Sequence, residues 1–286
     1  MNLKKQKIID AAYSLFINKG YISSSIQDIL DEAGVSKGTF YNYFSSKSEC
    51  LIAIMESIGS EIRQKRMAAA VGKEASDPEV LAEQLCIRIQ LNQEKNLFTL
   101  YESIFYSQEE ELKLFSRQTY VAELEWISLR IIDLFGEEAA PYALENAGMI
   151  HGSIQQLIHL WRLSSEEELP IEKLADFIIR RLKSTITKQM ETGDRFIREH
   201  KLSTEAPAEA ASLETLSVQL KEQAETLDEE EADAKQLVIF LSEELGSGKP
   251  RKIVCESVLA TLANFPAHEK TLVVLLEQAW KQLQKR

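Results

Sequence analysis

The stretch from residue 23 to 49 constrains the fold of this chain most, because it specifies two short helices joined by a tight turn. The first helix is expected from 26 to 33, where apolar residues recur at helical spacing: Ile26, Ile29, Leu30 and Ala33. Ser24 and Gln27 have the spacing of a capping box, and Gly34 ends the helix. Ser36 then caps a second helix. This arrangement is typical of a helix-turn-helix.

The second helix is expected to place two aromatic side chains inward and a polar set outward. Phe40 and Phe44 lie four residues apart and therefore share one face. The outward side chains can all donate hydrogen bonds and include no carboxylate: Lys37, Thr39, Tyr41, Asn42 and Tyr43. Gly38 lets the backbone approach another chain closely. Such a face suits the phosphates and base edges of a DNA groove, and the alternative is a surface helix of any helical bundle.

The stretch from Met1 to about Lys65 resembles the N-terminal domain of the TetR family of bacterial transcriptional regulators. The family pattern is met by five motifs: Gly20-Tyr21, Ser25, Ala33 to Ser36, Gly38 to Phe44 and Ser46 to Glu49. Leu30 departs from it, since the family usually has Ala there, and the larger side chain is expected to press on the packing between helices. The resemblance is strong over less than a quarter of the chain.

The resemblance implies specific DNA contacts. It implies phosphate contacts at Ser25, Tyr41, Tyr43 and Lys47, and base or backbone contacts at Lys37, Gly38, Thr39 and Asn42. Helix N-termini add bare N–H donors, which extends the set to the caps. The predicted DNA-binding residues are Ser25, Gln27, Ser36, Lys37, Gly38, Thr39, Tyr41, Asn42, Tyr43 and Lys47.

Composition predicts an all-α protein, because only 11 Gly and 6 Pro interrupt 286 residues rich in Leu, Glu, Lys and Ala. The net charge of −12 is unevenly distributed: residues 1–48 hold six Lys and four Asp or Glu, a balance of +2. The rest of the chain is strongly acidic. The protein is therefore expected to approach DNA with the mildly basic residues 1–48, because the acidic body is repelled by phosphate.

We expect four parts. Residues 1–48 form a three-helix helix-turn-helix domain, and residues 49–201 a helical domain for effector binding and dimerisation. Residues 202–212, rich in Pro, Ala and Ser, form a linker. Residues 213–286 form an extra helical module of unknown role. Its turn Lys249 to Lys252 is a basic spot in an acidic region, without the spacing of a phosphate-binding loop.

The body is expected to enclose an effector pocket, as the resemblance implies. Aromatic residues are densest between 93 and 135, although helical spacing also fits an ordinary core. The candidate pocket residues are Phe98, Tyr101, Phe105, Trp126, His151 and Gln155. The glutamates among the aromatic residues suit either a lipophilic cation or a solvated face. We expect a small apolar or amphipathic effector.

Two long helices are expected at Pro141 to about Leu163 and Pro170 to about His200. Small residues Ala147, Gly148 and Gly152 favour close approach of another helix. Apolar residues at helical spacing, from Ala143 to Trp161 and from Leu174 to Ile186, could build a four-helix bundle across a two-fold axis. These helices therefore predict a homodimer.

Other classes of function have little support. The 3 Cys are scattered in apolar patterns and the 4 His show no metal-ligand spacing, so we expect reduced core thiols, no metal and no cofactor. No apolar run is long enough to span a bilayer and no signal peptide is present, which predicts a cytoplasmic protein without membrane contact. No catalysis is needed, so we expect a non-enzyme.

Together these features predict a regulator that binds double-stranded DNA. It is expected to be a homodimeric repressor on a palindromic operator, released by its effector, with efflux or detoxification genes as targets suggested by the family. Two alternatives stay open: a helical metal-dependent enzyme that uses the acidic clusters, and a protein-interaction scaffold built on the C-terminal module.

Overall fold

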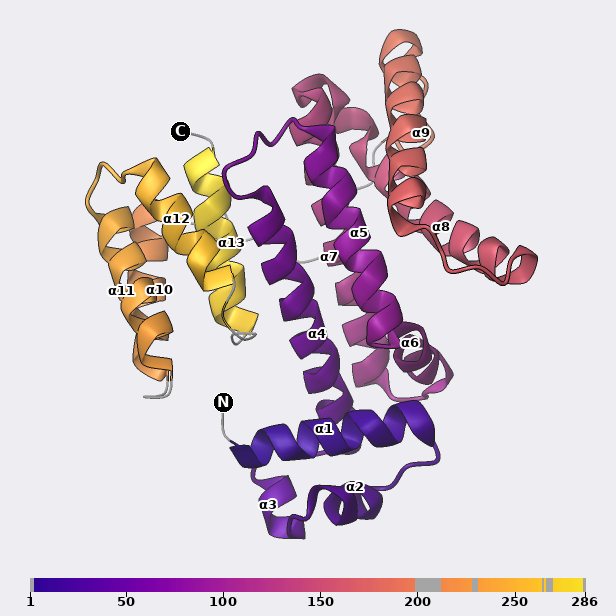
Figure 1. The fold of residues 1–286 in the computed structure, drawn as a ribbon, viewed down its shortest axis with the longest axis vertical. Coiled ribbons are helices and arrows are strands. Elements are labelled where there is room, and N and C mark those ends of the chain that lie inside the picture. Colours follow the sequence, from indigo (N-terminus) through magenta and orange to yellow (C-terminus); the bar gives the residue numbers. More distant parts are fainter. Residues whose placement is uncertain (1–2, 199–211, 228–230, 264, 266–269, 285–286) are drawn as a thin grey trace. The chain divides into compact units, whose positions relative to one another are not determined.

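The computed structural model describes residues 3–198, 212–227, 231–263, 265 and 270–284, except the side chains of Phe105, Tyr106, Lys270, Lys281 and Gln284. Within these ranges the chain is all-α, as predicted, and contains no strand (Figure 1). The chain divides into two compact units. The first comprises Met1–Val71, Leu91–Arg117 and Ala210–Arg286, and the second comprises Gly72–Gln90 and Gln118–Glu209.

The head of the first unit is a three-helix domain formed by α1 (Leu3–Asn18), α2 (Ile26–Ala33) and α3 (Lys37–Tyr41). Helix α1 contacts both α2 and α3. Phe16, Phe40 and Phe44 are buried between these helices, and the Phe40 and Phe44 rings lie 5.8 Å apart. Leu30 is also buried in a regular α2. The predicted helix-turn-helix is confirmed.

The start of α2 differs from prediction by one residue. The N-cap is Ser25, whose Oγ accepts the Asp28 N–H at 3.1 Å, while the Asp28 carboxylate accepts the Ser25 N–H at 2.7 Å. Ser24 is not the cap, because its buried hydroxyl donates to the Gly20 carbonyl at 2.7 Å. The pairing of Ser24 with Gln27 was therefore wrong. Gly34 ends α2 at φ 64°, as predicted.

Helix α4 (Lys47–Ala70) follows the head and buries an apolar stripe: Leu51, Ile54, Met55, Ile58 and Ile62. Ser46 caps it by accepting the Glu49 N–H at 3.0 Å. The Glu49 carboxylate accepts from Ser45, one residue earlier than a capping box with Ser46 requires.

Helix α6 (Leu97–Tyr106) belongs to the first unit. Helices α5 (Pro78–Glu94) and α7 (Glu110–Phe135) lie mostly in the second, with the short helix η1 (Glu137–Ala139), α8 (Ala140–Ser164) and α9 (Ile171–Thr192). The second unit has one apolar core, whose members include Leu81, Leu85, Ile89, Ile127, Ile131, Ala147, Ile150, Ile178, Leu182 and Ile186.

Helix α9 is shorter than predicted. It ends at Thr192 because Gly193 adopts φ 69°, the left-handed conformation that terminates a helix. The next residues are held by Glu145 of α8, whose carboxylate accepts the N–H groups of Phe196 and Ile197, both at 3.0 Å. The expected helix to about His200 was therefore wrong, and residue 200 lies outside the described residues.

The C-terminal module consists of α10 (Leu213–Thr226), α11 (Ala232–Gly246), α12 (Lys252–Ala263) and α13 (Lys270–Gln284). Its core includes Leu216, Leu220, Val238, Leu241, Cys255, Leu259, Leu262, Leu276 and Ala279. Met67 of α4 belongs to the same core, and both α12 and α13 contact α4 (Figure 1). The module therefore shares its interior with the helix that leaves the head.

The four expected parts remain predictions. Most of the linker, residues 202–211, lies outside the described residues, whereas Ser212 caps α10 by accepting the Thr215 N–H at 3.1 Å. The expected effector and dimerisation domain, 49–201, contributes to both compact units. The two compact units defined by contacts therefore do not coincide with the four parts expected from sequence composition.

Candidate nucleic-acid interface

The outward face of α3 carries side chains that donate hydrogen bonds. Ser36 caps the helix by accepting the Thr39 N–H at 3.2 Å, and the buried Phe40 fixes which side faces inward. Lys37, Tyr41 and Asn42 are exposed, while Thr39 and Tyr43 are half-buried. The Lys37 ammonium lies 5.9 Å from the centre of the Tyr41 ring. This short helix can therefore present a cation, hydroxyls and an amide to a partner.

Gly38 has no packing requirement inside the chain. A Cβ built at this position would meet only the Ser36 hydroxyl, at an ordinary 3.9 Å, and the backbone is helical. Glycine in a helix costs about 1 kcal/mol relative to alanine. Gly38 lowers helix stability, and no contact inside the chain requires it. This favours close approach of an external group at Gly38, as the DNA prediction requires.

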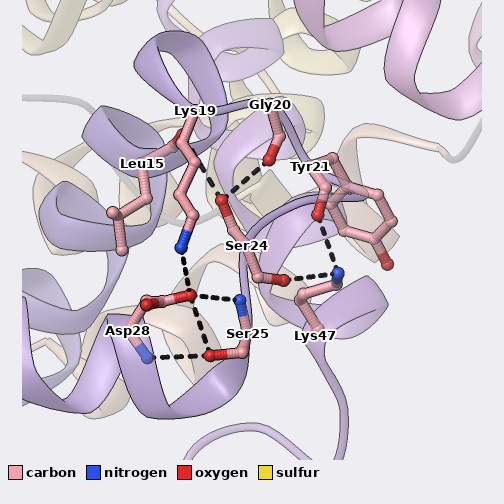
Figure 2. A network of polar contacts seen from close by, with 8 residues as sticks. All are labelled: Leu15, Lys19, Gly20, Tyr21, Ser24, Ser25, Asp28 and Lys47. Carbon is pink, nitrogen blue, oxygen red and sulfur yellow. Dashed lines mark hydrogen bonds and ion pairs between the residues drawn. The ribbon is translucent and has the colours of Figure 1, made fainter.

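The N-terminus of α2 presents Ser25 and Gln27 to solvent. Ser25 is bonded to Asp28, and the Lys19 ammonium lies 2.8 Å from the same carboxylate (Figure 2). The Lys19 hydrogen bond, followed by those from Ser25, holds the pKa of Asp28 well below its usual range. Gln27 donates to Asp31 at 2.7 Å. Lys19 thereby compensates the negative charge of Asp28 at a helix end that is predicted to face phosphate.

Lys47 is directed toward the turn between α1 and α2. Its ammonium donates to the carbonyls of Tyr21 and Ser24, at 2.7 and 2.8 Å, and lies 4.2 Å from the centre of the Tyr21 ring (Figure 2). Burial lowers the pKa of Lys47, while Glu109 and Asp28 oppose that change. Lys47 therefore fixes the start of α4 to this turn, and its phosphate contact remains a prediction.

Glu109, just before α7, and Glu111, in its first turn, bind the head within the first unit. The buried Tyr21 donates its hydroxyl to Glu109 at 2.7 Å, and Ser48 donates to Glu111 at 3.2 Å. Burial, then the bond to Glu109, raises the pKa of Tyr21. Sequence reasoning missed these contacts, because they join residues more than sixty positions apart with no local motif. The Ser25 and Asp28 cap was detectable, since Ser-x-x-Asp is a recognised cap spacing.

The six predicted effector-pocket residues are divided between the units. Phe98 and Tyr101 lie in the first unit, where Phe98 is exposed. The side chain of Phe105 lies outside the described residues. Trp126, His151 and Gln155 lie in the second unit.

Within the second unit, His151 packs edge-on against Tyr120, with ring centres 5.1 Å apart. Burial lowers the pKa of His151, opposed by Glu123 and reinforced by Arg88. Arg88 and Glu123 approach to 3.8 Å. Gln155 is exposed. A carboxylate, a guanidinium and an imidazole thus lie near one another in this unit, and the role of these side chains in effector binding remains a prediction.

The described part of the chain contains no group of three or more His, Cys, Asp or Glu side chains arranged to hold a metal ion. Its helices include none with the length and apolar character needed to cross a membrane. Cys50 and Cys255 are buried and Cys86 is half-buried. Burial raises the pKa of Cys50 to about 12 and those of Cys86 and Cys255 to about 11, so these thiols are protonated at neutral pH.

Known proteins match both the head and the longer chain. Residues 8–54 match the family model described as bacterial regulatory proteins, tetR family. The uncharacterized HTH-type transcriptional regulator YerO of Bacillus subtilis is 26% identical over 267 residues, 92% of this chain and 91% of YerO. The uncharacterized HTH-type transcriptional regulator YuxN of the same organism is 28% identical, over 68% of this chain and 67% of YuxN.

Among solved structures, a transcriptional regulator of the TerR/AcrR family from Aquifex aeolicus matches with a TM-score of 0.49 and 22% identity, over 64% of this chain and 99% of that one. The family match of residues 8–54 covers most of α1 and all of α2 and α3, the helix that carries the donor-rich face. The relatives that match well beyond the head are themselves named as HTH-type regulators. The match over residues 8–54 places the head of the chain in the tetR family of bacterial regulatory proteins.

Proposed function

We propose that the protein binds a palindromic DNA operator as a homodimer and leaves it when a small effector binds. The observation that carries this proposal is the exposed face of α3, which offers donors without carboxylates above the buried Phe40. Dimers of this kind place two recognition helices in major grooves one helical turn apart. Lys37, Thr39 and Asn42 contact bases or the adjacent backbone, and Ser25, Tyr41, Tyr43 and Lys47 contact phosphates.

The dimer interface is proposed on the outer face of α8. Met149, Gly152, Leu160 and Leu163 follow one another at helical spacing, and the three large side chains are exposed. A Cβ at Gly152 would meet nothing within 4 Å, which leaves room for a partner helix. The face expected from sequence is different. Ala143, Ala147 and Ile150, with Leu174 to Ile186 of α9, are buried in the second unit's own core.

Release of DNA by the effector follows from a difference between the effector's affinities for two conformations of the protein. A ligand that prefers the conformation in which the two heads are wrongly spaced shifts the population away from DNA. We assign the effector to the candidate residues of the second unit, Trp126, His151 and Gln155, and expect it to be apolar or amphipathic. Repression, control of efflux or detoxification genes, and a cytoplasmic location beside the chromosome complete the proposal. No catalytic step is part of it.

The experiment is fluorescence anisotropy of the full chain with DNA from upstream of its own gene, at about 50 and 200 mM salt. We expect sequence-selective binding that weakens steeply with salt. Lys37→Ala and Tyr41→Ala should each weaken it, while Lys183→Ala, at an exposed position on α9, should not. If no sequence binds, even after selection from a random library, the proposal is wrong.

A further inference from the structure

The hairpin of α11 and α12 in the C-terminal module carries an open apolar groove of about 420 Å³. Leu237 and Phe240 line it from α11, and Ile253, Val254 and Val258 line it from α12. Ile253 is 78% exposed and Phe240 is 38% exposed, and neither belongs to the module's core. Large apolar side chains at a groove that is open to solvent mark a surface for an apolar partner.

The hydroxyls in the groove are already bonded to the chain. Ser257 donates to the Ile253 carbonyl and Thr261 donates to the Ser257 carbonyl, each at 2.8 Å. Both bonds run along α12 itself. The hydroxyl protons are therefore already used, and the other lining residues are apolar, so the groove favours an apolar surface over a sugar or a nucleotide. It suits a surface that brings its own apolar face.

The geometry fits a helix better than a small molecule. Small-molecule sites bury most of their ligand, whereas Ile253 and Phe240 leave this groove open. The lining positions on α12 repeat three and four residues apart, as in the ridges that pack one helix against another. An amphipathic helix with an apolar stripe of the same spacing matches the groove.

The charges at one end of the groove select among helices. The turn between α11 and α12 holds Lys249 and Arg251, and α12 begins with Lys252. Arg251 is compensated by Glu244, with nitrogen to oxygen distances of 2.9 and 2.7 Å. Lys249 and Lys252 are exposed and have no ion pair among the described contacts, so they leave positive charge at this end. A helix with carboxylates beside its apolar stripe complements that charge.

We propose that this groove docks an acidic amphipathic helix of a partner protein. Helix α12 lines the groove and also contacts α4, the helix that leaves the DNA-binding head. A docked helix that shifts α12 therefore acts on α4 through the shared core around Met67. Occupancy of the groove is then a second input to DNA binding, separate from the effector, and this consequence rests on the proposed function.

The test uses the full chain and two synthetic helical peptides. One carries leucines three and four residues apart flanked by glutamates, and the other carries lysines in place of the glutamates. By anisotropy of the labelled peptides, the acidic peptide should bind at least about fivefold more tightly. Ile253→Glu should weaken its binding more than about tenfold. Val218→Glu is the matched control: this α10 residue is 59% exposed and does not line the groove, so binding should be unchanged.

Several results would overturn the docking proposal. The first is equal binding of the two peptides, and the second is binding that survives Ile253→Glu. A lower molecular mass of the Ile253→Glu variant in sedimentation would show that the groove holds a second copy of this chain. Binding of decanoate that Ile253→Glu abolishes, without binding of the acidic peptide, would show a lipid site instead.

A separate measurement tests the coupling to DNA. Saturating acidic peptide should change the operator dissociation constant by about fivefold or more. An unchanged constant with peptide bound would show that the coupling through α4 is wrong while docking stands. Absence of operator binding without peptide would count against the proposed function and not against the groove.

Discussion

The DNA-binding head and the C-terminal module lie in the same compact unit but present opposite kinds of surface. The head packs a few aromatic side chains, such as Phe16 and Phe40, beneath exposed donors. The module packs many aliphatic side chains and leaves an apolar groove at Phe240 and Ile253. A surface that meets a polyanion must be polar and is positioned by helix caps. A surface that binds an apolar partner can arise wherever two packed helices leave an apolar groove between them.

The largest difference between the two regions should appear when each core is truncated. Phe40→Ala removes a fully buried ring from a small domain and should cost about 3–5 kcal/mol of its stability. Because Phe40 lies at the centre of a small three-helix domain, we expect local unfolding and loss of DNA binding. Hydrogen exchange followed by mass spectrometry should show lost protection in α1 to α3.

Leu259→Ala is the counterpart in the module, where the larger core should absorb a cost of about 2–5 kcal/mol. We expect faster exchange in α10 to α13 while α1 to α3 stay protected. If each substitution speeds amide exchange equally in the head and in the module, the two regions unfold as one cooperative unit. Their stabilities would then not differ as proposed.

The second prediction concerns charge. Lys37→Ala should weaken operator binding about tenfold and reduce the slope of affinity against salt by about 1, because an exposed cation on α3 is lost. Lys249→Ala removes an equally exposed lysine from the module and should change neither quantity. Titrations of both variants at several salt concentrations measure this. Equal losses would mean that the module also contacts DNA.

The third prediction tests the assignment of the cap on α2. Ser25→Ala should lower the free energy of unfolding by about 1 kcal/mol, because it removes the acceptor of the Asp28 N–H. Ser24→Ala removes the hydroxyl's bonds to the Gly20 and Leu15 carbonyls, at 2.7 and 3.5 Å, and no cap, so it should cost less. Urea unfolding without DNA separates this effect from any phosphate contact. A larger loss at Ser24 would contradict the cap seen in the structure.

Local signals made the head predictable. The position of α2, the terminating Gly34 and the inward Phe40 and Phe44 all follow from residues a few positions apart. The dimer face of α8 stays a prediction, because periodicity identifies an apolar stripe but not what it packs against. Ala147 and Ile150 fill the unit's own core, and exposed Met149 and Leu160 were overlooked. Contacts such as Tyr21 with Glu109 depend on chain folding and carry no local pattern.

The smallest predicted effect belongs to the module and depends on pH. Arg251, which bonds to Glu244 through both its side chain and its backbone, lowers the pKa of that carboxyl from 4.5 to about 2. A lowered folded-state pKa stabilises the fold above the unfolded value, and the contribution is lost as pH falls toward the folded value. Glu244→Gln should therefore lower the melting temperature at neutral pH by less than Ser25→Ala does.

The difference between wild type and Glu244→Gln should shrink between pH 4.5 and about 2, as the wild-type carboxyl takes up its proton. Arg251 keeps its charge throughout this range, so only Glu244 changes. Thermal melts at several pH values, with Glu243→Gln as the control at a neighbouring exposed carboxyl, measure this closing. A difference that stays constant down to pH 2 would show that Glu244 stabilises the hairpin through its shape and not its charge. The ion pair would then contribute nothing to the stability of the turn beside the groove. In the head, by contrast, Lys19 compensates the charge of Asp28.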